Sequence, residues 1–175
     1  HTEVTKFNVC RFGNVSHSHG SVIPYWLALK SKNQPLPLTH EDMNRLMFSR
    51  HEAAELVNKA ILDSQSEIQP FILSQKMKSV NMLKLAKLIS NDIVNIGLRP
   101  GEKLNETLIS EKEASHTFVD GKYIIVKQEK NQNSNLLVGE YSSNNVEFMN
   151  KEEMMSTIME ADEMLDRSLL ETRVY

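Results

Sequence analysis

The spacing of apolar positions predicts helices that alternate with short strands in the first part of the chain. Three runs with apolar side chains at helical spacing each follow a serine that can cap a helix: residues 22–29 after Ser21, 53–61 after Ser49, and 83–89 after Ser79. Three shorter apolar runs have the length of buried strands: residues 7–10, 68–73 and 93–96. Strands that alternate with helices in this way predict an α/β fold.

The character of the sequence changes near residue 115, and we divide the chain there into residues 1–115 and 116–175. Beyond this boundary the pattern predicts three segments: a hairpin over residues 118–126 that turns at Asp120-Gly121, a polar loop over 129–135, and a helix from Asn150 to near Leu170. That helix has an apolar face rich in methionine, made of Met154, Met155, Ile158, Met159, Met164 and Leu165. We expect this face to pack on its own domain, and docking of a partner is the alternative.

Composition narrows the functional class. A chain of 175 residues with 40% hydrophobic and 25% charged residues is typical of a globular protein with one core. Its net charge of −3 argues against a nucleic-acid-binding surface, which is usually basic. We find no apolar run of about eighteen residues, so we expect no membrane span. The single cysteine, Cys10, fits a reducing cytoplasm and is expected to be a small buried side chain.

The first residues indicate a longer reading frame. The chain begins at His1 without an initiator methionine and enters a strand-like run at Val4. None of its six glycines forms the glycine-rich loop of a dinucleotide-binding fold. We therefore expect His1 to lie inside a larger protein, and processing or trimming of the chain is the alternative.

A turn at Arg99-Pro100-Gly101-Glu102 carries the most distinctive chemistry. Pro100 restricts Arg99 to extended backbone, and Gly101 accepts backbone angles closed to other residues. Such a turn can aim Arg99 and Glu102 at one target. A guanidinium pairs with phosphate oxygens and a carboxylate accepts hydrogen bonds from a ribose diol, so a nucleoside diphosphate fits this turn. The alternative is an exposed turn closed by an ion pair between the two side chains.

Five blocks of the sequence occur in the order found in one known family: Arg11-Phe12-Gly13-Asn14-Val15, Gly20-Ser21-Val22-Ile23-Pro24, Leu36-Pro37-Leu38-Thr39 with Met43-Asn44-Arg45-Leu46-Met47, Arg99 to Glu106, and Glu140-Tyr141-Ser142-Ser143. Together they resemble the C-terminal half of the CapD/PseB-like polysaccharide biosynthesis proteins. The corresponding family patterns include Arg-Tyr-Gly-Asn-Val, Gly-Ser-Val-x-Pro and Arg-x-Gly-Glu-Lys-x-x-Glu. The resemblance extends from about residue 5 to 145.

This resemblance implies an NADP-dependent UDP-N-acetylglucosamine 4,6-dehydratase, a lyase of the extended short-chain dehydrogenase/reductase family. It implies the late part of a Rossmann-type fold followed by a small substrate-binding region and an amphipathic helix. The family's glycine-rich loop and Tyr-x-x-x-Lys pair lie in a preceding Rossmann domain, which binds most of the cofactor. We expect this chain to lack both features, to contain no catalytic residue, and to be inactive alone.

Other functions remain open from the sequence. A non-catalytic UDP-sugar-binding or assembly subunit is one alternative, and another epimerase or reductase of the extended family is a second. The resemblance also implies a UDP-N-acetylhexosamine ligand, contact with an N-terminal Rossmann domain, and a homo-oligomer. The sequence does not say whether C5 of the sugar is inverted.

The resemblance assigns ligand contacts to individual residues. Arg45 corresponds to an arginine that contacts the UDP pyrophosphate, and Arg99 and Glu102 correspond to groups that hold phosphate and ribose. The remaining candidates are Asn14, Ser21, Val22 and Thr39 for the substrate and Phe12 for the nicotinamide. Asn14 can instead occupy a left-handed turn position and Phe12 can be an ordinary core residue. Ser21 and Val22 begin a helix, whose free N–H groups favour an anion.

His17 and His19 form a His-x-His pair. Two imidazoles do not complete a zinc site, and no further ligand lies close in the sequence. We therefore expect both in a solvated loop and no metal. The resembling family usually has Ser-Arg where this chain has Ser18-His19, which removes one positive charge near the substrate or makes it dependent on pH.

Overall fold

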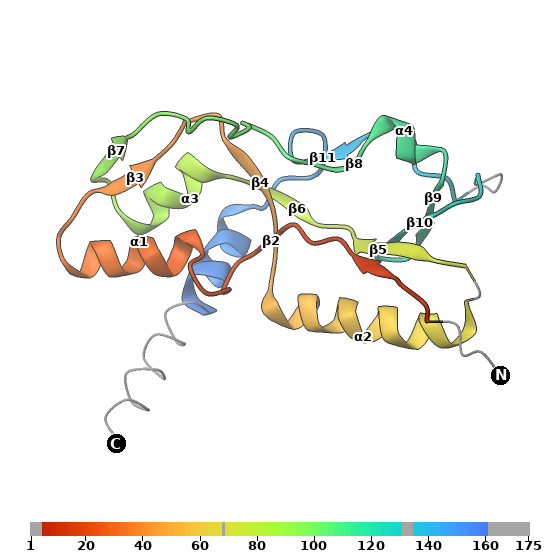
Figure 1. Ribbon diagram of the computed structural model, residues 1–175. Coiled ribbons are helices and arrows are strands. Elements are labelled where there is room, and N and C mark those ends of the chain that lie inside the picture. The colour runs from red at the N-terminus through yellow and green to blue at the C-terminus, as the bar shows by residue number, and fades with distance from the viewer. Residues whose placement is uncertain (1–4, 68, 131–134, 161–175) are drawn as a thin grey trace, which may run out of the picture.

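A computed structural model describes residues 5–67, 69–130 and 135–160 (Figure 1). The named elements, in chain order, are β1 (Val9–Cys10), β2 (Asn14–Val15), α1 (Val22–Ser31), β3 (Leu36–Leu38), β4 (Asn44–Phe48), α2 (Arg50–Ser66), β5 (Phe71–Gln75), β6 (Lys78–Asn81), α3 (Met82–Ile89), β7 (Ile93–Asn95), β8 (Thr107–Ile109), α4 (Glu111–Ala114), β9 (Thr117–Asp120), β10 (Tyr123–Lys127) and β11 (Tyr141–Ser142). Residues 151–160 form a further helix. The chain therefore mixes helices and strands, as the α/β prediction requires.

A four-stranded sheet with the order β1-β5-β10-β9 forms one end of the molecule. β1 runs parallel to β5, and the other two pairs are antiparallel. Helix α2 lies along this sheet (Figure 1), where Leu56 and Ala60 pack with Phe71 and Leu73 of β5. β9 and β10 follow residue 115, so the change in sequence character at that point does not coincide with a break in the sheet.

The capping signal of α2 is confirmed. The Ser49 hydroxyl accepts a hydrogen bond from the Glu52 N–H, and the Glu52 carboxylate accepts one from the Ser49 N–H at 2.8 Å. This reciprocal pair satisfies two backbone donors that the first turn leaves free. The helix therefore begins where the sequence predicts.

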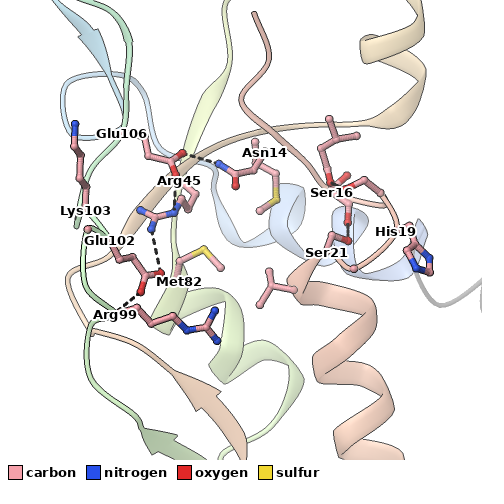
Figure 2. Close-up of a pocket in the computed structure, with 16 residues that line it drawn as sticks. Asn14, Ser16, His19, Ser21, Arg45, Met82, Arg99, Glu102, Lys103 and Glu106 are labelled. Atoms are coloured by element: carbon pink, nitrogen blue, oxygen red, sulfur yellow. Dashed lines mark hydrogen bonds and ion pairs between the residues drawn. The ribbon is translucent and has the colours of Figure 1, made fainter.

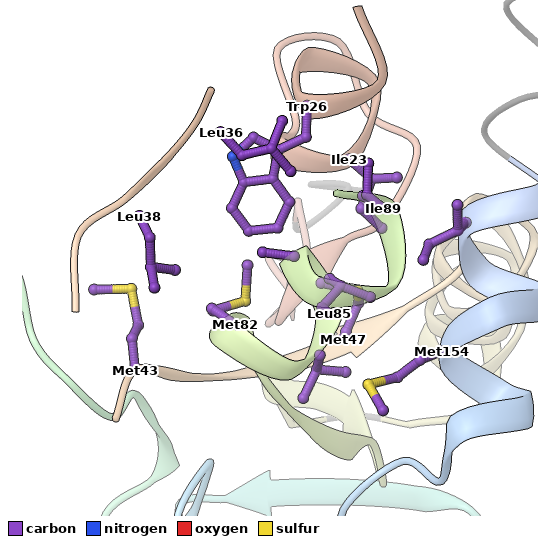
Figure 3. Close-up of a cluster of buried hydrophobic side chains, with 13 residues drawn as sticks. Ile23, Trp26, Leu36, Leu38, Met43, Met47, Met82, Leu85, Ile89 and Met154 are labelled. Carbon is purple, nitrogen blue, oxygen red and sulfur yellow. The ribbon is translucent and has the colours of Figure 1, made fainter. Parts of the chain in front are cut away.

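The largest core lies at the opposite end, between α1, α3 and β3 (Figure 3). Trp26 of α1 is its largest buried side chain, and its indole N–H donates to the Pro37 carbonyl at 3.0 Å. Leu36 and Leu85 are fully buried beside it. The helix of residues 151–160 contributes Met154 and Ile158 to this core, as expected for packing on its own domain. Met155 and Met159 of the same predicted face are 37% and 59% exposed.

Strands β4 and β6 are among those that the sequence pattern does not predict. They pair antiparallel, and β4 also pairs with β2 to give the order β2-β4-β6. The proposed cap Ser79 therefore lies inside β6 and is fully buried. Asn81 caps α3 instead, because its side-chain oxygen accepts the Lys84 N–H at 3.0 Å. The prediction for Ser79 was wrong because strand pairing prevailed over a local capping pattern.

The start of β5 also differs from the pattern. β5 begins at Phe71, directly after Pro70, rather than at residue 68. The cap position of α1 is Ser21, yet its hydroxyl donates to the Ser16 carbonyl and makes no cap hydrogen bond. The hairpin of β9 and β10 is confirmed, with Gly121 in left-handed backbone at φ 57°. Residues 131–134 of the expected polar loop and the expected helix end near Leu170 lie outside the described residues.

Candidate functional site

A cavity of about 670 Å³ opens between the loop after β2, the start of α1, β4 and the segment before β8 (Figure 2). Six of the seven substrate residues expected from the sequence line it: Asn14, Ser21, Val22, Arg45, Arg99 and Glu102. The seventh, Thr39, lines an adjoining cavity of about 290 Å³ that shares the walls of Arg45, Arg99 and Glu102. Residues up to 88 positions apart in the chain thus meet at one place.

Arg45 is buried, and protein groups already surround most of its guanidinium nitrogens. Its Nη1 donates to the carbonyl oxygens of Asn44 and Leu104 at 3.0 and 3.1 Å. Its Nε lies 3.2 Å from Glu106 Oε1, and its Nη2 lies 3.7 Å from Glu102 Oε1. Because 3.7 Å is too long for a hydrogen bond, Nη2 is the part of this guanidinium that keeps donor capacity on the cavity side.

The Arg99-to-Glu102 turn forms as the sequence indicates, with Gly101 at φ 82°. The Glu102 N–H donates to the Arg99 carbonyl at 3.0 Å, and the Arg99 N–H donates to Glu102 Oε2 at 3.2 Å. The Glu102 carboxylate forms its ion pair with Arg45. Within the described residues, the Arg99 guanidinium makes no hydrogen bond or ion pair, so the alternative of an Arg99–Glu102 side-chain pair is wrong.

Asn14 bridges two walls of the cavity from strand β2. Its Nδ2 donates to Glu106 Oε2 at 2.9 Å and to the Leu46 carbonyl at 3.2 Å. Among the described residues other than glycine, only Asn33 has a positive φ, so Asn14 does not occupy a left-handed turn position. It is instead a short side chain fixed by two hydrogen bonds.

Sequence reasoning did not single out Glu106, which contacts both Asn14 and Arg45. Its backbone is held by Ser143, whose hydroxyl accepts the Glu106 N–H at 2.9 Å and whose N–H donates to the Glu106 carbonyl at 2.9 Å. Both residues belong to blocks that carried the resemblance, but block order alone cannot say which member touches which.

The loop of residues 16–21 forms a second wall of the cavity. Ser16, Ser18, His19, Gly20 and Ser21 line it. The Ser21 hydroxyl donates to the Ser16 carbonyl at 3.0 Å and closes the loop. Ser21 and Val22 therefore border the cavity at the start of α1.

The adjoining cavity has a more apolar wall. Besides Thr39, its lining includes Tyr25, Trp26, Pro37, Leu38, Met43 and Ile96. The Thr39 hydroxyl donates to the Met43 sulfur at 3.1 Å. A polar cavity with two guanidinium groups is thus continuous with a smaller pocket that contains flat aromatic and proline surfaces.

Phe12 lies outside both cavities. It stacks on Phe48, with ring centroids 5.8 Å apart and an angle of 25° between the planes, and 42% of the residue is exposed. It lines a third cavity of about 420 Å³ together with Asn14, Lys103 and Glu106. The Asn14–Glu106 hydrogen bond therefore lies between the main cavity and the one beside Phe12.

The two histidines have different surroundings. His19 is exposed and lines the main cavity, whereas His17 is buried, with its Nε2 2.9 Å from Glu160 Oε2. The expectation of a solvated loop was therefore wrong for His17, because that side chain turns back onto the helix of residues 151–160. In the part of the chain that the structure describes, no three His, Cys, Asp or Glu side chains are grouped to hold a metal ion.

The expectation that the chain lacks a Tyr-x-x-x-Lys spacing was wrong. This spacing occurs at Tyr123 and Lys127. Both lie on strand β10, where four residues span about 13 Å, so the two side chains are not neighbours as they would be on a helix. The Lys127 ammonium pairs with Glu67 at 3.0 Å, and neither residue lines the cavities described above. This pair is therefore structural.

Comparison with known proteins identifies the family. Residues 1–128 match the family model described as polysaccharide biosynthesis protein. The chain belongs to this family. The cavity residues from Asn14 to Glu106 all lie within the matched region, whereas Ser143 lies beyond it.

Relatives of this chain include named enzymes. It is 32% identical over 117 residues to a UDP-N-acetylglucosamine 4,6-dehydratase (inverting) of Campylobacter jejuni, covering 65% of this chain and 34% of the relative. It is 29% identical over 175 residues to a UDP-glucose 4-epimerase of Rickettsia bellii, covering 90% of this chain and 50% of the relative. An uncharacterized membrane protein of Methanocaldococcus jannaschii is 35% identical over 173 residues, covering 89% of this chain and 50% of the relative.

A solved structure has the same fold. Pen from Bacillus thuringiensis matches with a TM-score of 0.76 and 30% identity, over 89% of this chain and 49% of Pen. The protein thus has a mixed α/β architecture of the short-chain dehydrogenase/reductase type, with parallel and antiparallel sheets. It spans about half the length of the Methanocaldococcus and Rickettsia relatives and about a third of the Campylobacter relative. Among the described residues, no helix combines the length and apolar character needed to cross a bilayer.

Proposed function

We propose that this chain is the nucleotide-sugar-binding portion of an NADP-dependent UDP-N-acetylglucosamine 4,6-dehydratase in surface polysaccharide biosynthesis. The observation that carries the proposal is that Arg45 and Arg99, which are far apart in the sequence, line the same cavity. Guanidinium groups are well suited to a diphosphate, because they present several donors in a fixed plane. The family and the dehydratase relative support the reaction class.

The cavity's charges suggest how a diphosphate would bind. Two carboxylates accompany Arg45, so much of its charge is already balanced. Arg99 and Lys103 also line the cavity, and neither side chain is paired with another described residue. We therefore assign the main anion contact to Arg99, with Arg45 Nη2 as a second donor. Glu102 lies between these two groups and can accept hydrogen bonds from ribose hydroxyls.

The adjoining pocket offers a place for the base. Its walls of Tyr25 and Pro37 provide flat apolar surface, on which a pyrimidine ring can pack. Thr39 stands at the same pocket. A ligand that spans both cavities would place its base on the apolar side and its diphosphate beside Arg99. UDP-linked sugars have this arrangement of groups.

The residues present fit only one edge of an NADP site. Phe12 presents an exposed ring beside a cavity on the far side of Asn14, which suits contact with a nicotinamide. The sequence contains no glycine-rich loop for the dinucleotide phosphates. When bound, NADP would supply the hydride acceptor for oxidation at sugar C4. This chain's residues would contribute binding and orientation of the sugar nucleotide.

We also propose that a Rossmann-type half, of the kind the relatives have length to contain, packs against β1. β1 is at the end of its sheet, and parallel strands are normally covered on both faces. Glu55 and Lys59 of α2 face the start of β10: Glu55 pairs with Lys122 in the turn before the strand, and the Lys59 ammonium lies over the Tyr123 ring. Helix geometry therefore directs Val57 and Ile61 to the other flank, beside β1, where they are 40% and 54% exposed.

Titration of the 175-residue chain with UDP tests the binding proposal. We expect Arg99→Gln to weaken UDP affinity by about one to two orders of magnitude, because a charge-assisted hydrogen bond is lost. The control Lys32→Gln removes one positive charge at an exposed position outside the cavities. Absence of UDP binding by the unmodified chain, or equal affinity in both variants, would refute the proposal.

Two further experiments separate the rival functions. The DNA upstream of His1 should encode a glycine-rich loop and a Tyr-x-x-x-Lys in frame; a stop codon followed by a start site would favour a binding or assembly subunit. The corresponding full enzyme should convert UDP-N-acetylglucosamine to a 4-keto-6-deoxy sugar, observed by NMR. A 4-epimer product would instead favour an epimerase. The 175-residue chain alone should show no turnover.

A further inference from the structure

Glu106 occupies a particular position behind the cavity. Its two carboxylate oxygens have different partners: Oε1 lies 3.2 Å from Arg45 Nε, and Oε2 accepts the Asn14 amide at 2.9 Å. Figure 2 shows this carboxylate between the two side chains. The carboxylate therefore fixes the separation between an amide and a guanidinium that come from different strands.

The backbone of Glu106 is itself immobilised by a fully buried serine. The Ser143 hydroxyl accepts the Glu106 N–H and donates to the Asn44 carbonyl at 3.0 Å, and the Ser143 N–H donates to the Glu106 carbonyl. The same Asn44 carbonyl accepts from Arg45 Nη1. One serine thus joins the segment that carries Glu106 to the start of the strand that carries Arg45.

These contacts fix the guanidinium plane of Arg45. Glu106 forms an ion pair with Nε, and the carbonyl oxygens of Asn44 and Leu104 accept hydrogen bonds from Nη1. Among the three guanidinium nitrogens, Nη2 then lies farthest from its protein partner, 3.7 Å from Glu102 in the cavity wall. Without Glu106, the plane could rotate about the last side-chain bonds and direct a different edge to the cavity.

We propose that Glu106, held by Ser143, is a positioning residue that orients Arg45 toward the diphosphate of the ligand. This inference rests on the proposed nucleotide-binding function. It predicts that recognition of the diphosphate depends on residues 141–143, which come from the far end of the chain. It also predicts that the uridine part of the ligand is recognised independently of Glu106.

The test compares UDP with uridine in four forms of the full 175-residue chain, using NMR titration for affinity and thermal melting for stability. Glu106→Gln keeps the size of the side chain and an oxygen for Asn14 but loses the charge that holds Arg45. We expect UDP affinity to fall about tenfold and uridine affinity to change less than twofold. Glu106→Asp should recover part of the UDP affinity, because it restores the charge. The control Glu140→Gln removes an exposed carboxylate outside the three cavities described above.

The outcomes separate this inference from the function on which it rests. If the unmodified chain does not bind UDP, the proposed function fails and the inference fails with it. If the unmodified chain binds UDP and Glu106→Gln binds it within twofold, only the positioning role is refuted. An equal loss of UDP and uridine affinity would also refute it, since that result indicates a general structural effect.

Discussion

Arg11 and Glu113 form a bidentate ion pair that joins the start of the chain to helix α4. Arg11 Nη2 lies 2.8 Å from Glu113 Oε1, and Nη1 lies 3.1 Å from Oε2. Nη1 also donates to the Leu108 carbonyl at 2.7 Å. The pair therefore anchors strand β8, and the segment before it that lines the cavity, to the loop between β1 and β2. Arg11 opened a block of the resemblance, and the structure gives it a structural role.

This pair should make stability depend on acid pH. The hydrogen bonds from Arg11, supported by the Ser110 N–H and hydroxyl, lower the pKa of Glu113 from 4.5 to about 2. Because the folded-state pKa is the lower one, the stabilisation is present above pH 4.5 and is lost as pH falls from 4.5 toward 2. Glu113→Gln should lower the free energy of unfolding at pH 7 by about 1–2 kcal/mol. It should also make the free energy of unfolding fall less steeply as the pH drops from 4.5 toward 2.

Urea unfolding at several pH values measures that effect. The control Glu111→Gln removes an exposed carboxylate from the same helix and should keep the slope of the parent. If the stability of Glu113→Gln falls between pH 5 and 2 as steeply as that of the parent, the loss of stability in acid does not come from the Arg11–Glu113 pair.

Gly13, in the loop after β1, leaves no room for a side chain against strand β4. A Cβ atom there would lie 2.8 Å from the Leu46 carbonyl oxygen and 2.8 Å from the Met77 sulfur. The methionine can move, but the carbonyl belongs to the strand that carries Arg45. Gly13→Ala should therefore destabilise the fold by about 1–3 kcal/mol and weaken UDP binding. Thermal unfolding checks this prediction. A melting temperature equal to that of the parent would contradict it, because strand β4 would then move aside with no loss of stability.

The sequence predicts the helices better than the strands. The pattern at Ser49 and Glu52 contains all the information that the start of α2 requires, because both partners of the capping box lie within one turn. Strands β4 and β6 depend on each other across more than thirty residues, and local patterns such as the one at Ser79 do not reveal that pairing.

In the candidate site, too, the sequence predicted what depends on local patterns and missed what depends on contacts between distant segments. The ordered blocks identified Arg45, Arg99 and Glu102 as members of one site, and all three line one cavity. The blocks did not predict that Glu102 would pair with Arg45 rather than with Arg99, since that choice depends on the path of β4. For the same reason Glu106 and Ser143 were missed: their contacts join segments that are distant in the sequence.

Tyr141 should be the main anchor of the C-terminal segment. Its hydroxyl accepts the Met77 N–H at 2.7 Å and donates to the Met77 carbonyl at 2.8 Å, and burial raises the pKa of this phenol. Tyr141→Phe leaves both backbone groups of a buried residue without this partner, so we expect a loss of about 2–3 kcal/mol in unfolding free energy. Tyr25→Phe, at a residue that is 52% exposed, is the matched control. Equal stability of the two variants would contradict the anchoring role.

Val57 and Ile61 should respond to lysine substitution only in a longer protein that contains the Rossmann-type half. In the 175-residue chain both side chains are exposed, so lysine should change unfolding free energy by no more than about 0.5 kcal/mol. In the longer protein, a lysine beside β1 would be buried against the added half, and we expect a loss of about 2 kcal/mol or more. Leu62 is 62% exposed and lies about 100° further round the helix, away from β1, so Leu62→Lys should be neutral in both chains. Unfolding of both chains in urea gives the comparison. Equal effects of the three lysines in the longer protein would place its additional half elsewhere than on this flank of α2.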